Sequence, residues 1–158
     1  MAEFVPKLVQ PPPLFAFSKF SEDARSIMCS AVKISRNLEY SYIATHHLFY
    51  ALLEHNFATP CMMFGGFDLP IFEIRMATLR LDPPRFMEIA PALRTTEATW
   101  NCYSWAVENL NPEGEIVTPF GIYSGFLRFR ESIVDAILAE RGIRINDEFD
   151  LERNPNCS

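Results

Sequence analysis

All three histidines of the chain, His46, His47 and His55, fall within residues 41–56, so this stretch is the first place to look for metal or acid–base chemistry. Histidines that hold a metal from one helix stand four positions apart, as in the HExxH pattern, and this spacing is absent. We therefore expect no metal site. We expect an ordinary helix start with a polar His46, a half-buried His47, and His55 near the C-terminal end, where the helix dipole favours positive charge.

The four cysteines, Cys29, Cys61, Cys102 and Cys157, are the second set with chemical potential. No two of them form the CxxC pair that zinc and redox sites use, so we expect free thiols in a reducing compartment. An alternative is a cysteine-dependent enzyme in which Cys61 approaches His47 or His55. No nucleophile elbow and no HExxH supports it. We expect a protein that is not an enzyme, with no catalytic residues and no cofactor.

Composition and charge narrow the class of protein. Hydrophobic residues make up 49% and charged residues 22%, which is typical of a globular domain. The net charge of -6 argues against a nucleic-acid partner, which requires a basic surface. The apolar runs are too short to span a membrane, and the N-terminus lacks the pattern of a secretory signal. We expect a cytoplasmic protein, with an organelle stroma as the alternative, and no membrane or nucleic acid as partner.

Capping residues predict where the helices begin. Ser21 is expected to cap a helix that ends at Asn37, and Thr45 a helix that contains the first two histidines. Further starts are expected at Thr59–Pro60, before Pro70, at Thr95 or Thr96, at Thr118–Pro119, near Glu131 and at Asn146, with Gly142 closing the seventh helix. The expected core positions are Ala24, Ile27, Leu48, Leu52, Met63, Phe64, Ala98, Leu127, Ile133, Ile137 and Leu138.

The two halves of the chain align without a gap. Ala24 aligns with Ala98, and Leu53 with Leu127, each pair 74 positions apart. Helix starts, apolar positions and turns coincide over this offset, which indicates an internal repeat. We predict an all-α fold, a tandem repeat of two four-helix units with pseudo-two-fold symmetry. Its parts are a proline-rich extended arm (1–17), repeat one (18–81), a linker (82–93), repeat two (94–153) and a tail (154–158).

The segment 20–53 resembles the opening of the Clp N-terminal repeat domain, the N-domain of the Clp-family unfoldases. The family pattern F-[ST]-E-x-A reads Phe20 to Ala24 here, and the pattern G-T-E-H followed by I-L-L-x-L-L reads Ala44 to Leu53. The similarity extends over residues 18–153 and is more specific in the first repeat than in the second. It implies a double-repeat helical domain that binds proteins.

Two positions depart from the family pattern. The resemblance implies that, in one branch, a glutamate in each G-T-E-H motif takes part in recognising phosphorylated arginine. This chain has His46 at the first position and Phe120 at the second, and neither supplies the carboxylate that pairs with a guanidinium. We therefore expect poor binding of phosphoarginine.

The resemblance leads to a function as a non-catalytic protein-binding module of the Clp protease system. Its partner would be a Clp-family unfoldase, the protease core, an adaptor or an unfolding substrate, because the chain lacks the G-x-x-x-x-G-K-[ST] loop of an ATPase. The candidate groove lies around the matched helix starts, where exposed aromatic rings beside polar groups would form a binding surface. It comprises Phe20, Ser21, Thr45, His46, Arg94, Thr95, Pro119 and Phe120. A structural or oligomerisation module that uses the N-terminal arm remains an alternative.

Overall fold

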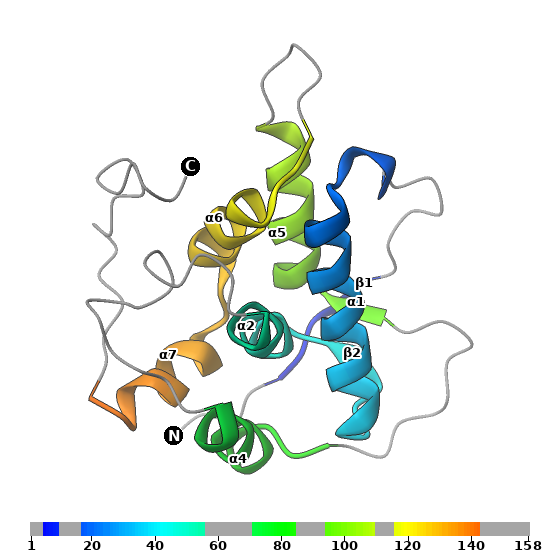
Figure 1. Ribbon diagram of the computed structural model, residues 1–158. Coiled ribbons are helices and arrows are strands. Elements are labelled where there is room, and N and C mark those ends of the chain that lie inside the picture. The colour runs from blue at the N-terminus through cyan, green and yellow to red at the C-terminus, as the bar shows by residue number, and fades with distance from the viewer. Residues whose placement is uncertain (1–4, 10–16, 56–70, 85–93, 110–115, 143–158) are drawn as a thin grey trace.

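The computed structural model describes residues 5–9, 17–55, 71–84, 94–109 and 116–142, and this part of the chain is mostly helical (Figure 1). The α-helices are α1 (Glu22–Asn37), α2 (Thr45–Glu54), α4 (Ile71–Leu81), α5 (Glu97–Glu108), α6 (Pro119–Phe129) and α7 (Ser132–Ala139). The strands are β1 (Leu8–Val9), β2 (Tyr42–Ile43) and β3 (Arg94–Thr96), and a 3-10 helix spans Phe17–Lys19. None of the described helices combines the length and apolar character that crossing a membrane requires.

Helix α1 begins and ends where the sequence predicts. The Ser21 side chain accepts a hydrogen bond from the Ala24 N–H at 3.1 Å, and Glu22 and Asp23 follow in the first turn. Both features stabilise a helix N-terminus, because they satisfy a free N–H group and oppose the positive end of the dipole. Asn37 is the last helical residue, and Glu39 then adopts a φ of 65°, which turns the chain out of the helix.

The other caps are confirmed in part. Thr96 caps α5 and accepts from the Thr99 N–H, which decides between the two candidate threonines. Thr118 is the N-cap residue of α6 by its backbone, but its side chain makes no capping bond; Pro119 follows as expected. The prediction for α2 is wrong by one residue, since Ala44 is the N-cap and Thr45 the first helical residue. Thr45 instead uses its hydroxyl for a contact distant in sequence, described below.

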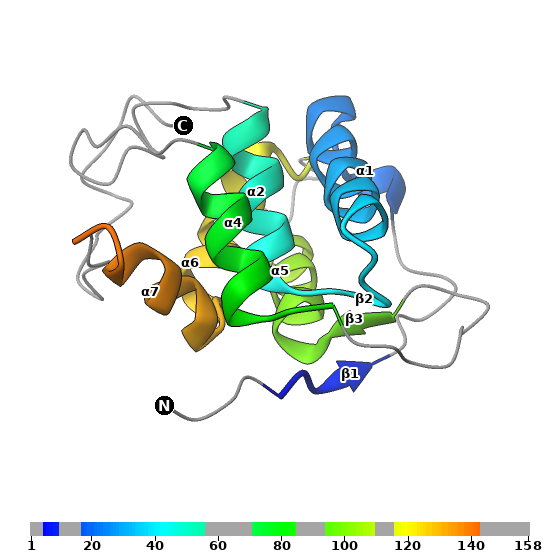
Figure 2. The same cartoon turned by 90° about the horizontal axis from the view of Figure 1, so that it is seen from below.

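A small three-stranded sheet, ordered β1-β3-β2, is the feature that the all-α prediction missed (Figure 2). β1 pairs antiparallel with β3, and β2 pairs parallel with it. Strands of two or three residues are too short to show the alternation by which a sequence reveals a strand. The predicted N-terminal arm therefore contributes a strand, although its residues 10–16 lie outside the described part of the chain.

The helix starts are joined across the two halves. Phe20, just before α1, forms a parallel bridge with Val117, just before α6. Ile43, just before α2, pairs in parallel with Thr95, just before α5. The arrangement is reciprocal, and the pseudo-two-fold relation between the halves stays a prediction. The four-helix content of each unit stays a prediction, because the expected helices at residues 59–64 and 146–153 lie outside the described residues.

The core lies where the two halves meet. The rings of Phe49 on α2 and Phe126 on α6 stack with centroids 5.4 Å apart. Helix α6 approaches α5 so closely that a Cβ on Gly125 would lie 2.4 Å from the Cys102 carbonyl oxygen. Of the predicted core, these residues are buried: Ala24, Ile27, Leu48, Leu52, Leu127, Ile133, Ile137 and Leu138. Ala98 is only half-buried, and Met63 and Phe64 lie outside the described residues.

Candidate functional site

The start of α1 lies against the start of α6. The Ser21 N–H donates to the Val117 carbonyl at 2.9 Å, and the Val117 N–H donates to the Lys19 carbonyl at 2.7 Å. The start of α5 likewise lies beside the start of α2, through the β2–β3 pairing. The sequence grouped the candidate residues by repeat, whereas the structure groups them by these crossed pairs.

Burial corrects the expected groove. Five of its eight residues are buried: Phe20, Thr45, His46, Thr95 and Pro119. Arg94 is exposed, and Ser21 and Phe120 are partly exposed. The expectation of an exposed aromatic is therefore wrong for Phe20, because the bridge to Val117 turns its ring into the core. Phe120 keeps some solvent-accessible surface while it packs against that core.

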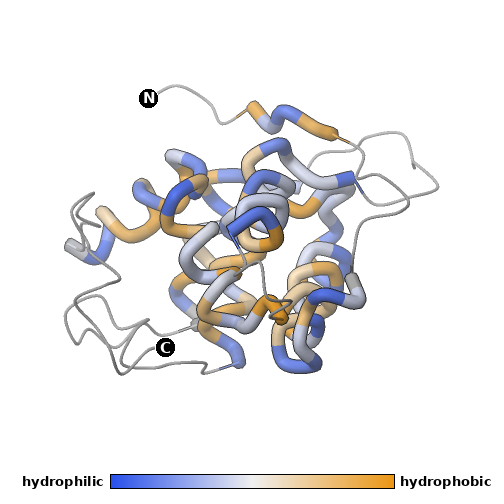
Figure 3. The backbone as a smooth tube through the Cα atoms, turned by 90° about the horizontal axis from the view of Figure 1, so that it is seen from above, coloured by the Kyte–Doolittle hydropathy of each residue, from blue (hydrophilic) through white to orange (hydrophobic). Residues whose placement is uncertain are grey.

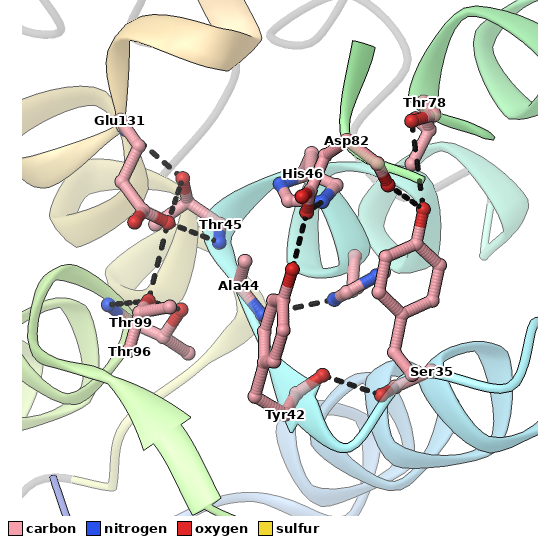
Figure 4. Close-up of polar contacts among 12 residues, drawn as sticks. Ser35, Tyr42, Ala44, Thr45, His46, Thr78, Asp82, Thr96, Thr99 and Glu131 are labelled. Atoms are coloured by element: carbon pink, nitrogen blue, oxygen red, sulfur yellow. Dashed lines mark hydrogen bonds and ion pairs between the residues drawn. The ribbon is translucent and has the colours of Figure 1, made fainter. Parts of the chain in front are cut away.

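Two neighbouring residues, Thr45 and His46, point into two separate polar networks, which Figure 4 shows on either side of the first turn of α2. In a helix, adjacent side chains diverge by about 100°, so one helix start can serve two sites. We call these the Glu131 network and the Asp82 network, each after its carboxylate.

The Glu131 network joins three helix N-termini. One oxygen of the Glu131 carboxylate accepts from the Thr45 N–H at 2.8 Å, the Thr45 hydroxyl at 2.9 Å and the Thr96 hydroxyl at 3.1 Å. The Glu131 N–H donates back to the Thr45 hydroxyl oxygen at 2.9 Å. Thr45 opens α2, Thr96 caps α5 and Glu131 precedes α7, so a negative charge lies where three positive helix ends converge.

The Asp82 network holds the end of α4 against β2 and α2. The Tyr42 hydroxyl donates to Asp82 Oδ2 at 2.7 Å, and His46 Nε2 lies 3.0 Å from the same oxygen. The Tyr40 hydroxyl donates to the Asp82 backbone carbonyl. Both His46 and Asp82 are completely buried. The Asp82 carboxylate is therefore stabilised by hydrogen bonds from the protein and not by bulk water.

His47 is buried beside this network and is held in one tautomer. Its Nδ1 accepts a hydrogen bond from the Ala44 N–H at 2.9 Å, so the neutral ring carries its proton on Nε2. Burial, and secondarily the electrostatic effect of His46, lowers the pKa of His47 well below its usual value. The sequence interpretation of a polar His46 and a half-buried His47 is wrong, because both side chains are fully buried.

The thiol chemistry that the sequence left open has little support among the described residues. Burial raises the pKa of Cys102, which keeps it a thiol and not a nucleophilic thiolate. Cys29 is an exposed free cysteine, and its neighbour Ser30 hydrogen-bonds His55 at 2.6 Å. Cys61 and Cys157 lie outside the described residues. Within the described ranges, no cluster of three His, Cys, Asp or Glu side chains could hold a metal ion.

Surface grooves lie between helices in the described part of the chain. One of about 270 Å³ separates α4 from α7, and the Arg80–Glu140 and Glu73–Arg141 ion pairs cross it above Ile74 and Ile137. Another of about 340 Å³ is lined by Ser30, Lys33, Ile34, Asn37, Leu38, Tyr50, Glu54 and Arg75, from α1, α2 and α4 and the residue that follows α1. The first groove has an apolar floor under charged walls, and the second is more polar.

Sequence reasoning missed the acidic residues of both networks. The sequence predicts a linker at Asp82 and a helix start near Glu131, without a partner for either side chain. In the structure Asp82 accepts a hydrogen bond from Tyr42 of its own half, and Glu131 accepts one from Thr45 of the other half. Tyr40 and Tyr42 were not singled out either. Their only signal in sequence is the unusual pair of tyrosines between two helices, and this does not identify a partner.

Known proteins share this fold although they share little sequence. No protein-family model matches the chain, and no curated protein matches it. The structure is similar to the crystal structure of the N-terminal domain of the caseinolytic protease associated chaperone ClpD from Arabidopsis thaliana, with a TM-score of 0.64 at 18% identity, over 84% of this chain and 91% of that one. It is also similar to the Hsp104 N-terminal domain from Candida albicans, with a TM-score of 0.62 at 16% identity, over 78% and 82% of the two chains. The fold is therefore that of a Clp N-domain.

Proposed function

We propose that this protein is a non-catalytic protein-binding module of a Clp-type unfolding and proteolysis system. The observation that carries the proposal is the similarity of 84% and 78% of the chain to the N-terminal domains of ClpD and Hsp104. Its partner would be a Clp-family unfoldase, the protease core, an adaptor or an unfolding substrate. The absence of a phosphate-binding loop from the sequence supports a role that depends on the ATPase of another chain or domain.

The cytoplasm or an organelle stroma is the proposed compartment. The free thiols of Cys29 and Cys102 support it, because reducing compartments keep cysteines unpaired.

The partner surface that we propose includes the start of α6. Phe120 is a large aromatic residue with accessible surface in the first turn of α6, three positions after Val117, whose carbonyl accepts from the N–H of the partly exposed Ser21. Aromatic residues at the centre of an interface contribute most to binding energy. A rigid helical module with a patch of standard size or smaller would bind in the micromolar range and release quickly, which suits transfer of a client to a motor.

A capture experiment tests the proposal. The purified chain is mixed with a purified Clp-family unfoldase, protease core or adaptor of its own organism, and complex formation is measured by interferometry. Phe120→Ala should weaken capture at least tenfold, whereas Phe129→Ala, which truncates another half-buried phenylalanine on the same helix, should not. Unfolding curves of both variants control for loss of stability.

The negative outcomes are distinct. If no Clp-type component binds the wild-type chain at tens of micromolar, the proposed function is wrong. If binding occurs but the two variants behave alike, the function stands and the surface at Phe120 is wrong.

Phosphoarginine is not part of this proposal. His46 is buried against Asp82, and Phe120 offers an apolar ring, so neither family position presents a carboxylate to a ligand. We expect calorimetry with free phosphoarginine to detect no micromolar binding, and expect His46→Glu to disturb folding instead of restoring a site, because it would place two carboxylates side by side in the interior.

A further inference from the structure

We propose that the outer edge of β3 is a strand-addition slot for an extended peptide that carries a basic residue followed by two apolar residues. The chain's own residues 7–9 occupy this slot in the structure and so compete with a partner for it. The inference deepens the proposed function, on which it rests, by naming a second segment that a protein partner would contact.

The slot is one side of β3, the central strand, whose other side pairs with β2. β2 pairs with β3 in parallel on one side, and β1 pairs antiparallel on the other, with Leu8 opposite Thr96 and Val9 opposite Thr95. Figure 2 shows β1 on the outside of the molecule, next to β3 and farther from the helices than β3 is, and residues 5–9 also lie at the periphery in Figure 3. A strand edge offers unpaired N–H and C=O groups, and an extended peptide binds such an edge through its backbone.

Three contacts give the slot its chemical preference. The Glu97 N–H, at the first position of α5, donates to the Lys7 carbonyl at 2.7 Å. The Glu97 carboxylate lies 2.7 Å from Lys7 Nζ, and this pairing raises the pKa of Lys7. Leu8 is partly buried against the core. The slot therefore binds a backbone carbonyl, a cation and an apolar side chain in succession.

The occupant is held weakly enough to be exchanged. Within the described residues 5–9, the pairing comprises Leu8, Val9 and the one backbone bond at Lys7, while the Lys7 side chain is 80% exposed and Val5 is 73% exposed. A surface ion pair is weakened by salt and by the entropy of its long side chain. The segment nevertheless has an advantage over free peptides, because a short tether gives it an effective concentration on the order of millimolar.

The experiment releases the segment and supplies it as a separate molecule. The full ¹⁵N-labelled chain carries Lys7→Glu and Val9→Pro, and the probe is a synthetic peptide with the sequence of residues 3–10. Lys7→Glu opposes Glu97. In an antiparallel ladder every second pair of opposite residues exchanges backbone hydrogen bonds. Lys7 and Glu97 form such a pair, so Val9 and Thr95 form the next such pair. Val9→Pro therefore removes the backbone N–H that Val9 would donate to Thr95.

The released variant should bind the peptide at least tenfold more tightly than the wild-type chain, with amide shifts at Thr95 and Glu97. Peptide with glutamate in place of its lysine should bind the released variant at least tenfold more weakly. Lys19→Glu is the matched control, because it makes the same charge change at an exposed lysine of the 3-10 helix and should behave as wild type.

Three results would overturn the inference: no peptide binding by the released variant, binding equal to that of the wild-type chain, or shifts that map away from β3. If the double variant does not fold, Lys7→Glu alone decides the question, since its side chain is exposed, and it should still raise peptide affinity about threefold. If the peptide experiment fails, the proposed capture of a Clp-type component through α6 is unaffected. If that capture fails, the peptide result still stands. The two proposals are therefore tested separately.

Discussion

The Asp82 and Glu131 networks lie on opposite sides of the same helix start and use a carboxylate in different ways. Asp82 is completely buried, and its partners Tyr42 and His46 come from the same half of the chain. Glu131 is partly exposed and accepts hydrogen bonds at helix N-termini from both halves. The first network fixes α4 to its own half, whereas the second joins the two halves.

The difference shows how solvent sets the importance of a polar contact. A buried carboxylate that loses its partners has no water to replace them, so the cost of disrupting it is high. A partly exposed carboxylate that loses one donor can be hydrated, so its disruption costs no more than a few hydrogen bonds. The comparison predicts a ranking of effects, which the following measurements test.

The largest effect is expected from Asp82→Ala. Removing the carboxylate leaves the buried Tyr42 hydroxyl and His46 ring without their acceptor, and breaking a buried pair costs about 3–5 kcal/mol. Urea unfolding of the variant measures this loss. Lys7→Ala is the control, because its side chain is 80% exposed in a surface ion pair with Glu97, and the substitution should cost much less than Asp82→Ala. Equal losses in the two variants would contradict the ranking.

A pH dependence should follow from His47. Because burial lowers its pKa in the folded state, the unfolded chain takes up a proton first as the pH falls. Stability should be constant above about pH 7 and fall below the unfolded pKa of about 6.5, by about 1.4 kcal/mol per pH unit, or roughly 2 kcal/mol by pH 5.

His47→Gln sharpens the test, since glutamine can still accept the Ala44 N–H as in a capping box but does not titrate. Its pH profile between 7 and 5 should be flatter than that of the wild-type chain. His55→Gln is the control, because His55 is exposed and should leave the slope unchanged. A slope carried by His55 would refute the assignment.

A smaller effect is expected from Glu131→Gln, which should lower the free energy of unfolding by about 1.5 kcal/mol. The amide oxygen of glutamine still accepts hydrogen bonds, but it carries no charge. Thr45→Val should couple to it in a double-mutant cycle, since the two side chains bond reciprocally. The cycle of Thr45→Val with Asp82→Ala should be nearly additive, because those side chains belong to different networks. Strong coupling there would mean that the two networks act as one.

The smallest effect concerns the caps. Ser21→Ala should cost about 1 kcal/mol, because the bond to the Ala24 N–H is lost. Thr118→Ala should lower the free energy of unfolding by only about a few tenths of a kcal/mol, because the Thr118 side chain makes no capping bond. Thermal unfolding of the pair checks the difference, and a larger loss at Thr118 would show that its position in the turn matters more than its hydroxyl.

The sequence by itself determined the local features: the helix starts at Ser21, at Thr95 or Thr96, and at Pro119, the end of α1 at Asn37, and the apolar faces that form the core. These features depend on capping residues, on charges near helix ends and on the spacing of apolar residues, all within one or two helical turns. Residues that are close in sequence decide them, so the sequence alone predicts them. The resemblance to the Clp N-domain, based on two motifs in the first half, also led to the fold that the structure has.

Only the tertiary structure decided which of those helix-start residues are accessible and what they contact. Thr45 bonds a residue 86 positions away, and Tyr42 one that is 40 positions away. The strand pairing of Phe20 with Val117 and of Thr95 with Ile43 then turns side chains inward that the sequence had assigned to a surface groove. A capping residue looks the same in sequence whether its other face meets water or another helix, because burial is a property of the assembled chain rather than of any single turn.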